Sequence, residues 1–350
     1  MDSRPGRRAL SRAGLSLRVL VHGAGSIGCY VGATWAGAGF DVSFLGRERI
    51  AQEVAEHGMT VTDGEGRAVA LDAGTLHFST SPEVLAEADL IALCVKSTGT
   101  AAAAAEIARH ARPGTTVISF QNGVSNVETL TEKLPGLDIL RGMVPFNVVH
   151  LGDGRWHKSV RGALVAEDRE ITRALSERIG DRPGKLILSG DMTGLAWGKL
   201  LINLNNAVNA LSGKTLLEQL GTRDYRRVVA ASQREALAML AAAGIAPAAI
   251  GPISPARLPL VFGLPDFLFR RLVLAKWKID ANGRSSMADD FAAGRPTEID
   301  YLNGEVVRLA ERLGRPAPVN RAVVALVREA EAGGRRHFEA KDLRARVPGA

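Results

Sequence analysis

The sequence predicts an α/β fold in which an N-terminal Rossmann-type doubly wound sheet is followed by an all-helical C-terminal domain. An apolar β-type run at 17–22 leads into glycines spaced G-x-G-x-x-G. Short apolar runs and helical segments then alternate up to about residue 190, which is typical of a parallel sheet with crossover helices. From Thr193 onward the strand signals cease and helical periods take over. We therefore expect a nucleotide-binding domain over 17–190 and a helical, substrate-binding domain over 191–334.

The glycine-rich turn in LRVLVHGAGSIG, residues 17–28, has the pattern of a dinucleotide site. The first glycine permits a tight turn, the second lets the backbone approach a pyrophosphate, and the third lets the following helix pack closely on the strand. That helix would direct its amide N–H groups and positive dipole end toward the phosphates. In a chain with 38 glycines the spacing alone is weak, but the flanking strand and helix, and a second strand at 40–45, favour a nucleotide site over a plain turn. The expected contacts are Gly23, Gly25, Ser26, Ile27 and Gly28.

Composition and charge argue against a nucleic-acid or membrane partner. Hydrophobic residues make up 46% of the 350, and no apolar run reaches the roughly 20 residues of a membrane span. The net charge is +7, but residues 1–18 contribute +4 and residues 335–350 contribute +3. The chain between them is neutral, so no basic stripe across a folded face is indicated.

The two ends of the sequence are expected to be extensions. Residues 1–16 are polar and Arg-rich without an apolar core, so they are unlike a secretory signal and predict a disordered basic extension. Residues 335–350 predict a basic tail. Cys29 and Cys94 lack metal-ligand spacing, so we expect buried, reduced thiols in a cytoplasmic protein and no metal site.

Arg47 follows the second strand, where an NAD site usually carries an acid that accepts a hydrogen bond from the ribose 2′-OH. A guanidinium there would hold a 2′-phosphate through charge-assisted hydrogen bonds, which predicts NADP(H). The alternative is that Arg47 is a solvated loop residue and Glu48 binds the ribose.

Two polar residues stand at the ends of the next strands. Lys96 follows the apolar run 90–95, and Asn122 follows the strand 116–120. Because ligands of open α/β sheets bind at the carboxyl ends of strands, both residues are expected to face cofactor or substrate. The alternative is that they are ordinary strand-end residues.

The rest of the first domain completes its sheets. Residues 59–78 alternate and turn, which predicts a hairpin inserted into the parallel sheet. Residues 139–165 predict two or three further strands.

A long helix is predicted between Thr193, a good N-cap, and Gly213, a good stop. Lys199, Asn203 and Asn206 fall at i, i+4 and i+7 and so share one face of it. Unpaired buried polar groups cost about 1–3 kcal/mol each. The stripe therefore either lines a site or faces water.

Later segments continue the helical domain. Residues 245–278 hold five prolines and an apolar, basic stretch, which favours a packed connection or a subunit contact, as in a homodimer, over membrane contact. Thr297 is expected to cap a helix that carries Glu298 in its first turn, where a carboxylate suits the dipole. Asn320 is expected to cap the last amphipathic helix.

The ordered set of motifs resembles one family. A strand-glycine motif, VK at a strand end, QNG, WxKLxxN, SSMxxD and TEIDYLNG follow one another over residues 17–330. This series resembles the ketopantoate reductases (2-dehydropantoate 2-reductases), in which a Rossmann domain joins a helical domain with the active site between them. The resemblance implies NADPH-dependent reduction of 2-dehydropantoate (ketopantoate) to pantoate, as in pantothenate and coenzyme A biosynthesis.

The resemblance also implies roles for individual residues. Lys199 matches the general acid, and Glu298 the glutamate that supports it. Substrate contacts are implied for Asn203 and Ser286. Positions at the cofactor and the reaction centre, and an ordering role, are implied for Asn122, Lys96 and Asp290.

One position departs from the family pattern. Ala207 stands where many members have a second asparagine, and Asn206, one residue earlier, is a candidate to replace it in binding substrate. Two alternatives therefore remain: reduction of another 2-oxo acid on the same scaffold, or a non-catalytic NADP(H)-binding protein.

Overall fold

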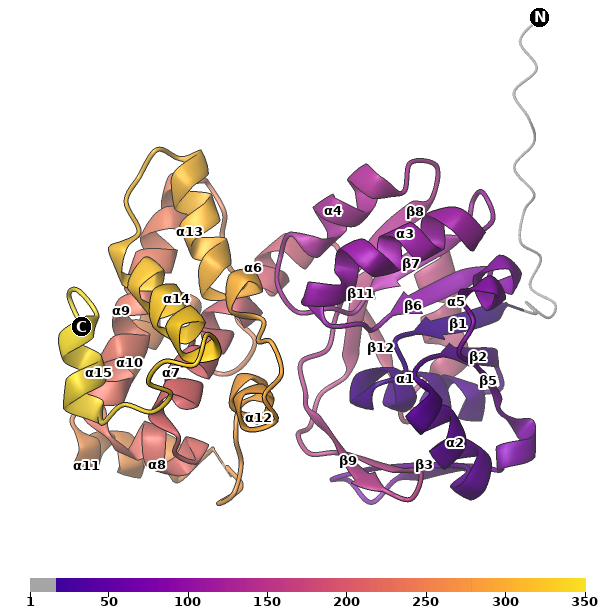
Figure 1. Cartoon of the computed structure of the whole chain (residues 1–350), viewed down its shortest axis with the longest axis horizontal. Helices are drawn as coiled ribbons and strands as arrows, with labels where there is room; N and C mark the ends of the chain where they lie inside the picture. Colours follow the sequence, from indigo (N-terminus) through magenta and orange to yellow (C-terminus); the bar gives the residue numbers. More distant parts are fainter. Residues whose placement is uncertain (1–16, 278) are drawn as a thin grey trace, which may run out of the picture.

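The computed structural model describes residues 17–277 and 279–350, which form two lobes side by side (Figure 1). The first lobe contains all the strands and the second is helical, and β12 of the first is followed directly by α6 of the second. The extension predicted for residues 1–16 lies outside the described residues.

The main sheet of the first lobe has eight strands in the order β12-β11-β8-β7-β6-β1-β2-β5. All neighbours are parallel except the β8–β11 pair. The central strands are apolar and buried on both faces, as a sheet covered on both sides requires. The strands are β1 (Arg18–His22), β2 (Asp41–Leu45), β5 (His77–Ser79), β6 (Leu90–Leu93), β7 (Thr116–Ser119), β8 (Asp138–Met143), β11 (Leu164–Glu167) and β12 (Leu186–Ser189). The helices are α1 (Ser26–Gly37), α2 (Glu48–His57), α3 (Thr100–His110), α4 (Asn126–Lys133) and α5 (Glu170–Ile179).

A second, four-stranded sheet corrects the prediction of a hairpin inserted into the parallel sheet. Strands β3 (Met59–Asp63) and β4 (Ala68–Leu71) join β9 (Val148–Gly152) and β10 (Arg155–Lys158) in the order β4-β3-β10-β9. Strand β3 alternates buried and partly exposed residues, so it has one face against a core rather than two. Of the segment 59–78, only β5 enters the main sheet. The segment 139–165 likewise holds parts of four strands, two of which belong to the second sheet.

The helical lobe begins with two helices where one was predicted. Helix α6 ends at Asn203 and α7 starts at Asn205, with the break at Leu204. The N-cap is Asp191 rather than Thr193, and its carboxylate accepts from the Gly194 amide at 2.8 Å. The helices are α6 (Met192–Asn203), α7 (Asn205–Ser212), α8 (Leu216–Gly221), α9 (Arg223–Ala242), α10 (Leu258–Phe262), α11 (Asp266–Phe269), α12 (Ser286–Ala292), α13 (Asn303–Arg312), α14 (Pro318–Glu331) and α15 (Ala340–Arg346).

The two caps predicted near the C-terminus are also wrong. Thr297 precedes a single 3-10 turn, η6 (Ile299–Tyr301), and α13 starts only at Asn303. Asn320 lies inside α14, fully buried, where its side chain bonds to Asn303 and Glu235, each at 2.9 Å. Thr297 Oγ1 accepts from the Ile299 amide at 3.3 Å, so it caps only this turn, whereas Asn320 serves a tertiary contact that local sequence does not reveal.

The segment 335–350, predicted as a basic tail, is part of the folded lobe. Helix α15 packs on α9, with Phe338, Leu343 and Val347 buried beneath it. The Tyr225 hydroxyl donates to the Phe338 carbonyl at 2.7 Å. Of the basic residues of α15, Lys341 and Arg346 are exposed, whereas Arg344 is partly buried and donates to Asp224 of α9 at 3.0 Å.

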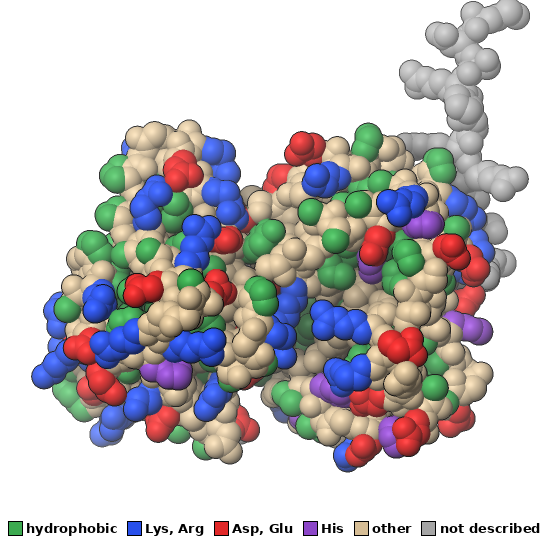
Figure 2. All heavy atoms as spheres, in the orientation of Figure 1, with side chains coloured by type: hydrophobic (Ala, Val, Ile, Leu, Met, Phe, Trp, Pro, Cys, Tyr) green, Lys and Arg blue, Asp and Glu red, His purple; other side chains and the backbone are tan. Residues whose placement is uncertain are grey.

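In the proline-containing segment predicted over 245–278, the described residues 245–277 form a packed connection. Helix α10 lies against α9, and the buried Arg226 guanidinium donates to the Leu264 carbonyl and the Asp266 carboxylate. Within residues 17–277 and 279–350, no helix is both long and apolar enough to cross a membrane. Figure 2 shows acidic and basic side chains interspersed on both lobes, with basic ones bordering the furrow between them.

The two cysteines are unpaired, as predicted. Cys29 is buried and Cys94 is partly buried. Burial raises the pKa of the Cys29 thiol well above its usual range and that of Cys94 to about 12, so both are protonated at neutral pH.

Candidate active site

The lobes meet where the carboxyl ends of β6 and β7 face α6, α12 and η6. Four residues of the first lobe reach across this boundary: Lys96, Ser97, Asn122 and Ser125. Their partners are Asp290, Glu298 and Glu305 of the helical lobe, and Asn122 also contacts Lys199 of α6. Polar side chains from sequence-distant segments thus converge at the end of the sheet where α/β folds bind ligands.

Lys199 is the central cation of this boundary. It is partly buried, and its Nζ donates to Asn122 Oδ1 at 2.9 Å and to the Val144 carbonyl at 2.5 Å. Burial lowers the pKa of Lys199 to about 8, although the negative charge of Glu298 acts in the opposite direction. The Lys199 ammonium has three N–H groups, and two of them have acceptors here. The third can therefore donate to a further oxygen.

Asn122 links Lys199 to Glu298. Its Oδ1 accepts from the lysine, while its Nδ2 donates to Glu298 Oε2 at 3.0 Å. Glu298 is buried, and its other oxygen accepts from the Ser97 amide at 2.8 Å. The amide of Asn122 is therefore fixed in one orientation, with its oxygen toward the cation and its nitrogen toward the anion.

A network beneath Asn122 holds its backbone in place. The Ser97 hydroxyl and the Asn126 amide both donate to the Asn122 carbonyl. Thr100 Oγ1 in turn donates to Asn126 Oδ1 at 2.8 Å. Neither Thr100 nor Asn126 was predicted as a site residue. The one indication in the sequence is that each is a polar residue at the start of a helix that follows a strand end.

Lys96 makes the second contact between the lobes. The prediction directed it toward cofactor or substrate, and in this structure its Nζ pairs with the buried Asp290 carboxylate of α12. Asp290 also accepts from Arg295 Nε at 3.0 Å. The ordering role expected of Asp290 corresponds here to an ion pair that joins the first lobe to α12.

The three remaining candidates lie on neighbouring helices. Asn203 is one turn after Lys199 on α6, Asn206 lies in the first turn of α7, and Ser286 starts α12, which packs on α7. Within the described part of the chain, none of their side chains hydrogen-bonds to another residue. Ser286 is exposed and both asparagines are partly exposed, whereas Ala207 is fully buried in the helical core. Of the two neighbours Asn206 and Ala207, a ligand can thus reach Asn206.

The neighbouring serine has a different role. Ser285 is the buried N-cap of α12, where it accepts from the Ala288 amide at 3.2 Å. Its own amide donates to Asn209 Oδ1 at 2.9 Å. Ser285 therefore anchors α12 and leaves Ser286 facing outward.

The glycine turn fits a pyrophosphate. Gly23 has φ +100°, and a Cβ there would lie 2.6 Å from the Val95 amide nitrogen. A Cβ on Gly28 would lie 2.2 Å from the Gly23 carbonyl oxygen, whereas nothing lies within 4 Å of one on Gly25. Helix α1 starts at Ser26 without a capping side chain or an acid in its first turn. The first N–H groups of α1 are thus left for an anion, and the space beside Gly25 lets it approach.

Arg47 is exposed at the N-cap of α2, directly after β2. Among the described residues its side chain has no hydrogen-bond or ion-pair partner. Glu48, the alternative ribose ligand, accepts from Gln52 Nε2 at 3.1 Å. Arg47 therefore has the freer side chain at this strand end. In the described residues, no group of three or more His, Cys, Asp or Glu is arranged to hold a metal ion.

Known proteins are similar to this chain in sequence and architecture. The model of the family "Ketopantoate reductase PanE/ApbA" matches residues 19–170, and that of its C-terminal domain matches residues 191–331. A 2-dehydropantoate 2-reductase of Halobacterium salinarum is 30% identical over 329 residues, covering 91% of this chain and all of the relative. One of Mycobacterium tuberculosis is 29% identical over 266 residues, covering 74% of this chain and 82% of the relative.

The solved structures agree in architecture. A PanE/ApbA family ketopantoate reductase from Ralstonia eutropha superimposes with a TM-score of 0.77 at 28% identity, covering 91% of this chain and 99% of that one. A D-mandelate dehydrogenase has the same fold, with a TM-score of 0.74 at 19% identity over 91% of this chain and 99% of its own. Family models that span both lobes, together with these relatives, establish that the chain belongs to the ketopantoate reductase family of oxidoreductases.

Proposed function

We propose that the protein reduces 2-dehydropantoate (ketopantoate) to pantoate with NADPH. The observation that carries this proposal is the array Lys199–Asn122–Glu298 at the boundary between the lobes. Reduction of a ketone leaves negative charge on its oxygen, so the site needs a positioned acid. Lys199, with a pKa lowered to about 8 and a proton to spare, meets that need near neutral pH.

In the proposed reaction, bound NADPH supplies the hydride to the carbonyl carbon of the substrate. Lys199 donates a hydrogen bond to the carbonyl oxygen and then transfers its proton to it. Asn122 holds Nζ in position, and Glu298 stabilises the positive charge of the lysine until transfer. Asn203, Asn206 and Ser286 are assigned to the carboxylate and hydroxyl groups of the substrate, because their side chains stand free on α6, α7 and α12.

The assignment of NADP(H) rather than NAD(H) rests on Arg47. A planar guanidinium suits the 2′-phosphate, and its exposed, unpartnered side chain follows β2, beside the glycine turn. Gly23, Gly25, Ser26, Ile27 and Gly28 are assigned to the pyrophosphate, and Lys96 to the cofactor once it leaves Asp290. We further infer a cytoplasmic location, which suits the two reduced thiols, and a homodimer, as in the dimeric ketopantoate reductase of Staphylococcus aureus.

A steady-state assay of NADPH absorbance tests the proposal. Ketopantoate is compared with a panel of other 2-oxo acids, and NADPH with NADH. Turnover selective for ketopantoate supports the full assignment. Turnover of a different 2-oxo acid only would retain the chemistry and replace the substrate.

The helix bend between α6 and α7 gives a structural reason why a different 2-oxo acid could be the substrate. Ala207 removes a polar group that many family members carry, and Asn206 presents an amide from a neighbouring position instead. The same fold also carries a D-mandelate dehydrogenase, solved with NADH and anilino(oxo)acetate. Binding of NADPH without turnover of any 2-oxo acid would instead favour a non-catalytic NADP(H)-binding protein.

A further inference from the structure

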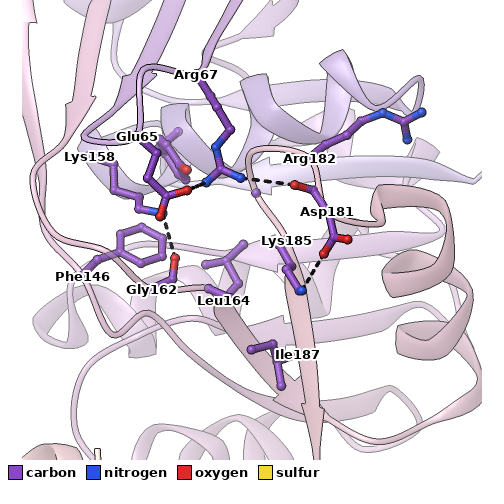
Figure 3. Close-up of a pocket in the computed structure, with 13 residues that line it drawn as sticks. Glu65, Arg67, Phe146, Lys158, Gly162, Leu164, Asp181, Arg182, Lys185 and Ile187 are labelled. Carbon is purple, nitrogen blue, oxygen red and sulfur yellow. Dashed lines mark hydrogen bonds and ion pairs between the residues drawn. The ribbon is translucent and has the colours of Figure 1, made fainter. Parts of the chain in front are cut away.

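A cavity of about 330 Å³ lies in the first lobe, away from the candidate active site. It opens between α1, the β3–β4 turn, β10 and the strands β11 and β12 (Figure 3). None of its lining residues belongs to the array around Lys199. Its volume is at the lower end of the range for small-molecule sites, about 300–1,000 Å³.

Lys158 of β10 is the unusual residue of this cavity. Its side chain is buried, and Nζ makes a single hydrogen bond, to the Gly162 carbonyl at 2.7 Å. Nζ also lies 4.8 Å from the centre of the Phe146 ring. In the described part of the chain no carboxylate forms an ion pair with Lys158. Burial lowers the pKa of this lysine, although the negative charges of Asp63 and Glu65 act in the opposite direction.

The nearby acids are already engaged. Asp63 accepts from Arg67 Nε at 2.8 Å, and Glu65 pairs with Arg67 Nη2 at 2.7 Å. Asp181, on the other side of the cavity, pairs with Lys185 at 2.6 Å (Figure 3). A buried charge is costly unless it is paired. Asp63 and Glu65 act on the Lys158 ammonium only through space, so among the described residues two of its three N–H groups have no acceptor and can bind an anionic ligand in the cavity.

A second unpartnered donor lines the same cavity. Tyr30 of α1 is 1% exposed, and its hydroxyl has no hydrogen-bond partner among the described residues. Its ring, like that of Phe146, faces the Lys158 ammonium, with 6.0 Å from Nζ to the ring centre. Two donors with spare capacity, one charged and one neutral, thus line one cavity.

The remaining walls select among anions. Leu164 and Ile187 contribute apolar surface, and the basic lining residues outnumber the acidic ones by four to two. Of the four basic residues, only Lys158 is buried; Arg67 and Lys185 are paired with acids and Arg182 is exposed. The single buried ammonium balances one negative charge, which matches a monoanion better than a phosphate dianion. A carboxylate on an apolar or aromatic body matches both the charge and the lining.

We propose that this cavity binds a small organic monocarboxylate, with Lys158 as its counter-ion and the Tyr30 hydroxyl as a second donor. The site is independent of the proposed reaction. The two sites are connected through one short segment of the chain. Phe146 packs on Lys158, and two residues earlier the Val144 carbonyl accepts from Lys199.

Isothermal titration calorimetry with benzoate and with inorganic phosphate tests the proposal on the full chain. Wild type is expected to bind benzoate at least tenfold more tightly than phosphate. Lys158→Met is expected to weaken benzoate binding roughly 10- to 100-fold, the range for loss of a charged hydrogen bond, and Tyr30→Phe by less. Lys199→Ala is the matched control for binding in the active-site region and should retain the affinity.

A further variant guards against misfolding of Lys158→Met. Ala163→Leu keeps the ammonium and narrows the cavity, so it should also abolish benzoate binding while the thermal unfolding midpoint stays near that of wild type. Unchanged affinity in both Lys158→Met and Ala163→Leu, loss of affinity in Lys199→Ala, or phosphate binding as tightly as benzoate would each overturn the assignment.

Discussion

At the scale of single residues, the candidate site depends on how one amide is oriented. Asn122 accepts from Lys199 with its oxygen and donates to Glu298 with its nitrogen, at 2.9 and 3.0 Å. A rotated amide would oppose both partners, so the Ser97 and Asn126 contacts that fix its backbone matter for the lysine. The pKa of Lys199 follows from the same setting, since burial lowers it and Glu298 limits that effect.

Replacement of Lys199 by alanine should remove the acid from the proposed reaction. General acid catalysis contributes a factor of about 10²–10⁴ in rate, so we expect kcat/KM for ketopantoate to fall by that factor. The fall corresponds to a loss of roughly 3–5 kcal/mol of transition-state stabilisation. Steady-state NADPH oxidation measures it, with far-UV circular dichroism as the folding control. Turnover within a few-fold of wild type would contradict the role.

The pH profile should report the same lysine. Only the protonated form can donate, and a group with a pKa of about 8 is protonated below that value. We therefore expect kcat/KM to be level at lower pH and to decline above about pH 8. In Glu298→Gln the charge that raises the pKa is gone, so the decline should begin at lower pH, with activity reduced about 10- to 100-fold. An unshifted profile in this variant would separate Glu298 from the lysine.

The cofactor preference should depend on Arg47. Without the Arg47 guanidinium, the 2′-phosphate loses charge-assisted hydrogen bonds that are each worth about 1.5–3 kcal/mol. Arg47→Ala should therefore raise KM for NADPH by roughly tenfold or more and leave KM for NADH nearly unchanged. Kinetics with both cofactors measure the ratio, and an unaltered ratio would argue for Glu48 or another residue.

At the scale of elements, the helical lobe differs from its sequence pattern where tertiary contacts intervene. The break at Leu204 turns one predicted helix into α6 and α7, so Asn206 lies in the first turn of the second helix rather than continuing the face of the first. The predicted caps Thr193 and Asn320 were wrong because Asp191 caps α6 and buried partners hold Asn320. Thr297 caps only the 3-10 turn η6, because α13 starts later, at Asn303. Periodicity gives the presence of a helix more reliably than its ends.

Helix α15 should contribute to stability although it lies in a segment of basic tail composition. Leu343 is fully buried beneath it, and truncation of a buried leucine to alanine typically costs about 2–5 kcal/mol. Leu343→Ala should therefore lower the free energy of unfolding by that amount in urea titration. Lys341→Ala, on the exposed face of the same helix, is the control, and equal stability of the two variants would mean that α15 is not docked in solution.

At the scale of the whole molecule, the site exists only because the two lobes meet. The Ser97–Glu298 bond joins residues 201 positions apart, and the Lys96–Asp290 pair joins residues 194 apart. Each lobe has its own core, so these polar contacts set the position of one lobe against the other rather than hold either together.

Asp290→Asn should loosen that arrangement. The buried carboxylate holds Lys96 and Arg295, and the amide cannot replace its charge. We expect KM for both NADPH and ketopantoate to rise about tenfold, consistent with loss of a hydrogen bond to a charged group, while the decline above pH 8 stays in place. A shifted pH profile with normal KM values would instead connect Asp290 to Lys199.

The sequence by itself determined the fold class, the glycine turn and the family, because these depend on local spacing and on the order of motifs along the chain. It also put Lys199, Glu298 and Asn122 forward, two of them through resemblance. Only the tertiary structure decided that Asn122 bridges the other two, that residues 59–71 join residues 148–158 in a second sheet, that α15 is docked, and that Lys158 and Tyr30 share a cavity. These are contacts between distant segments, and periodicity within a window of residues carries no information about which buried faces and polar groups meet.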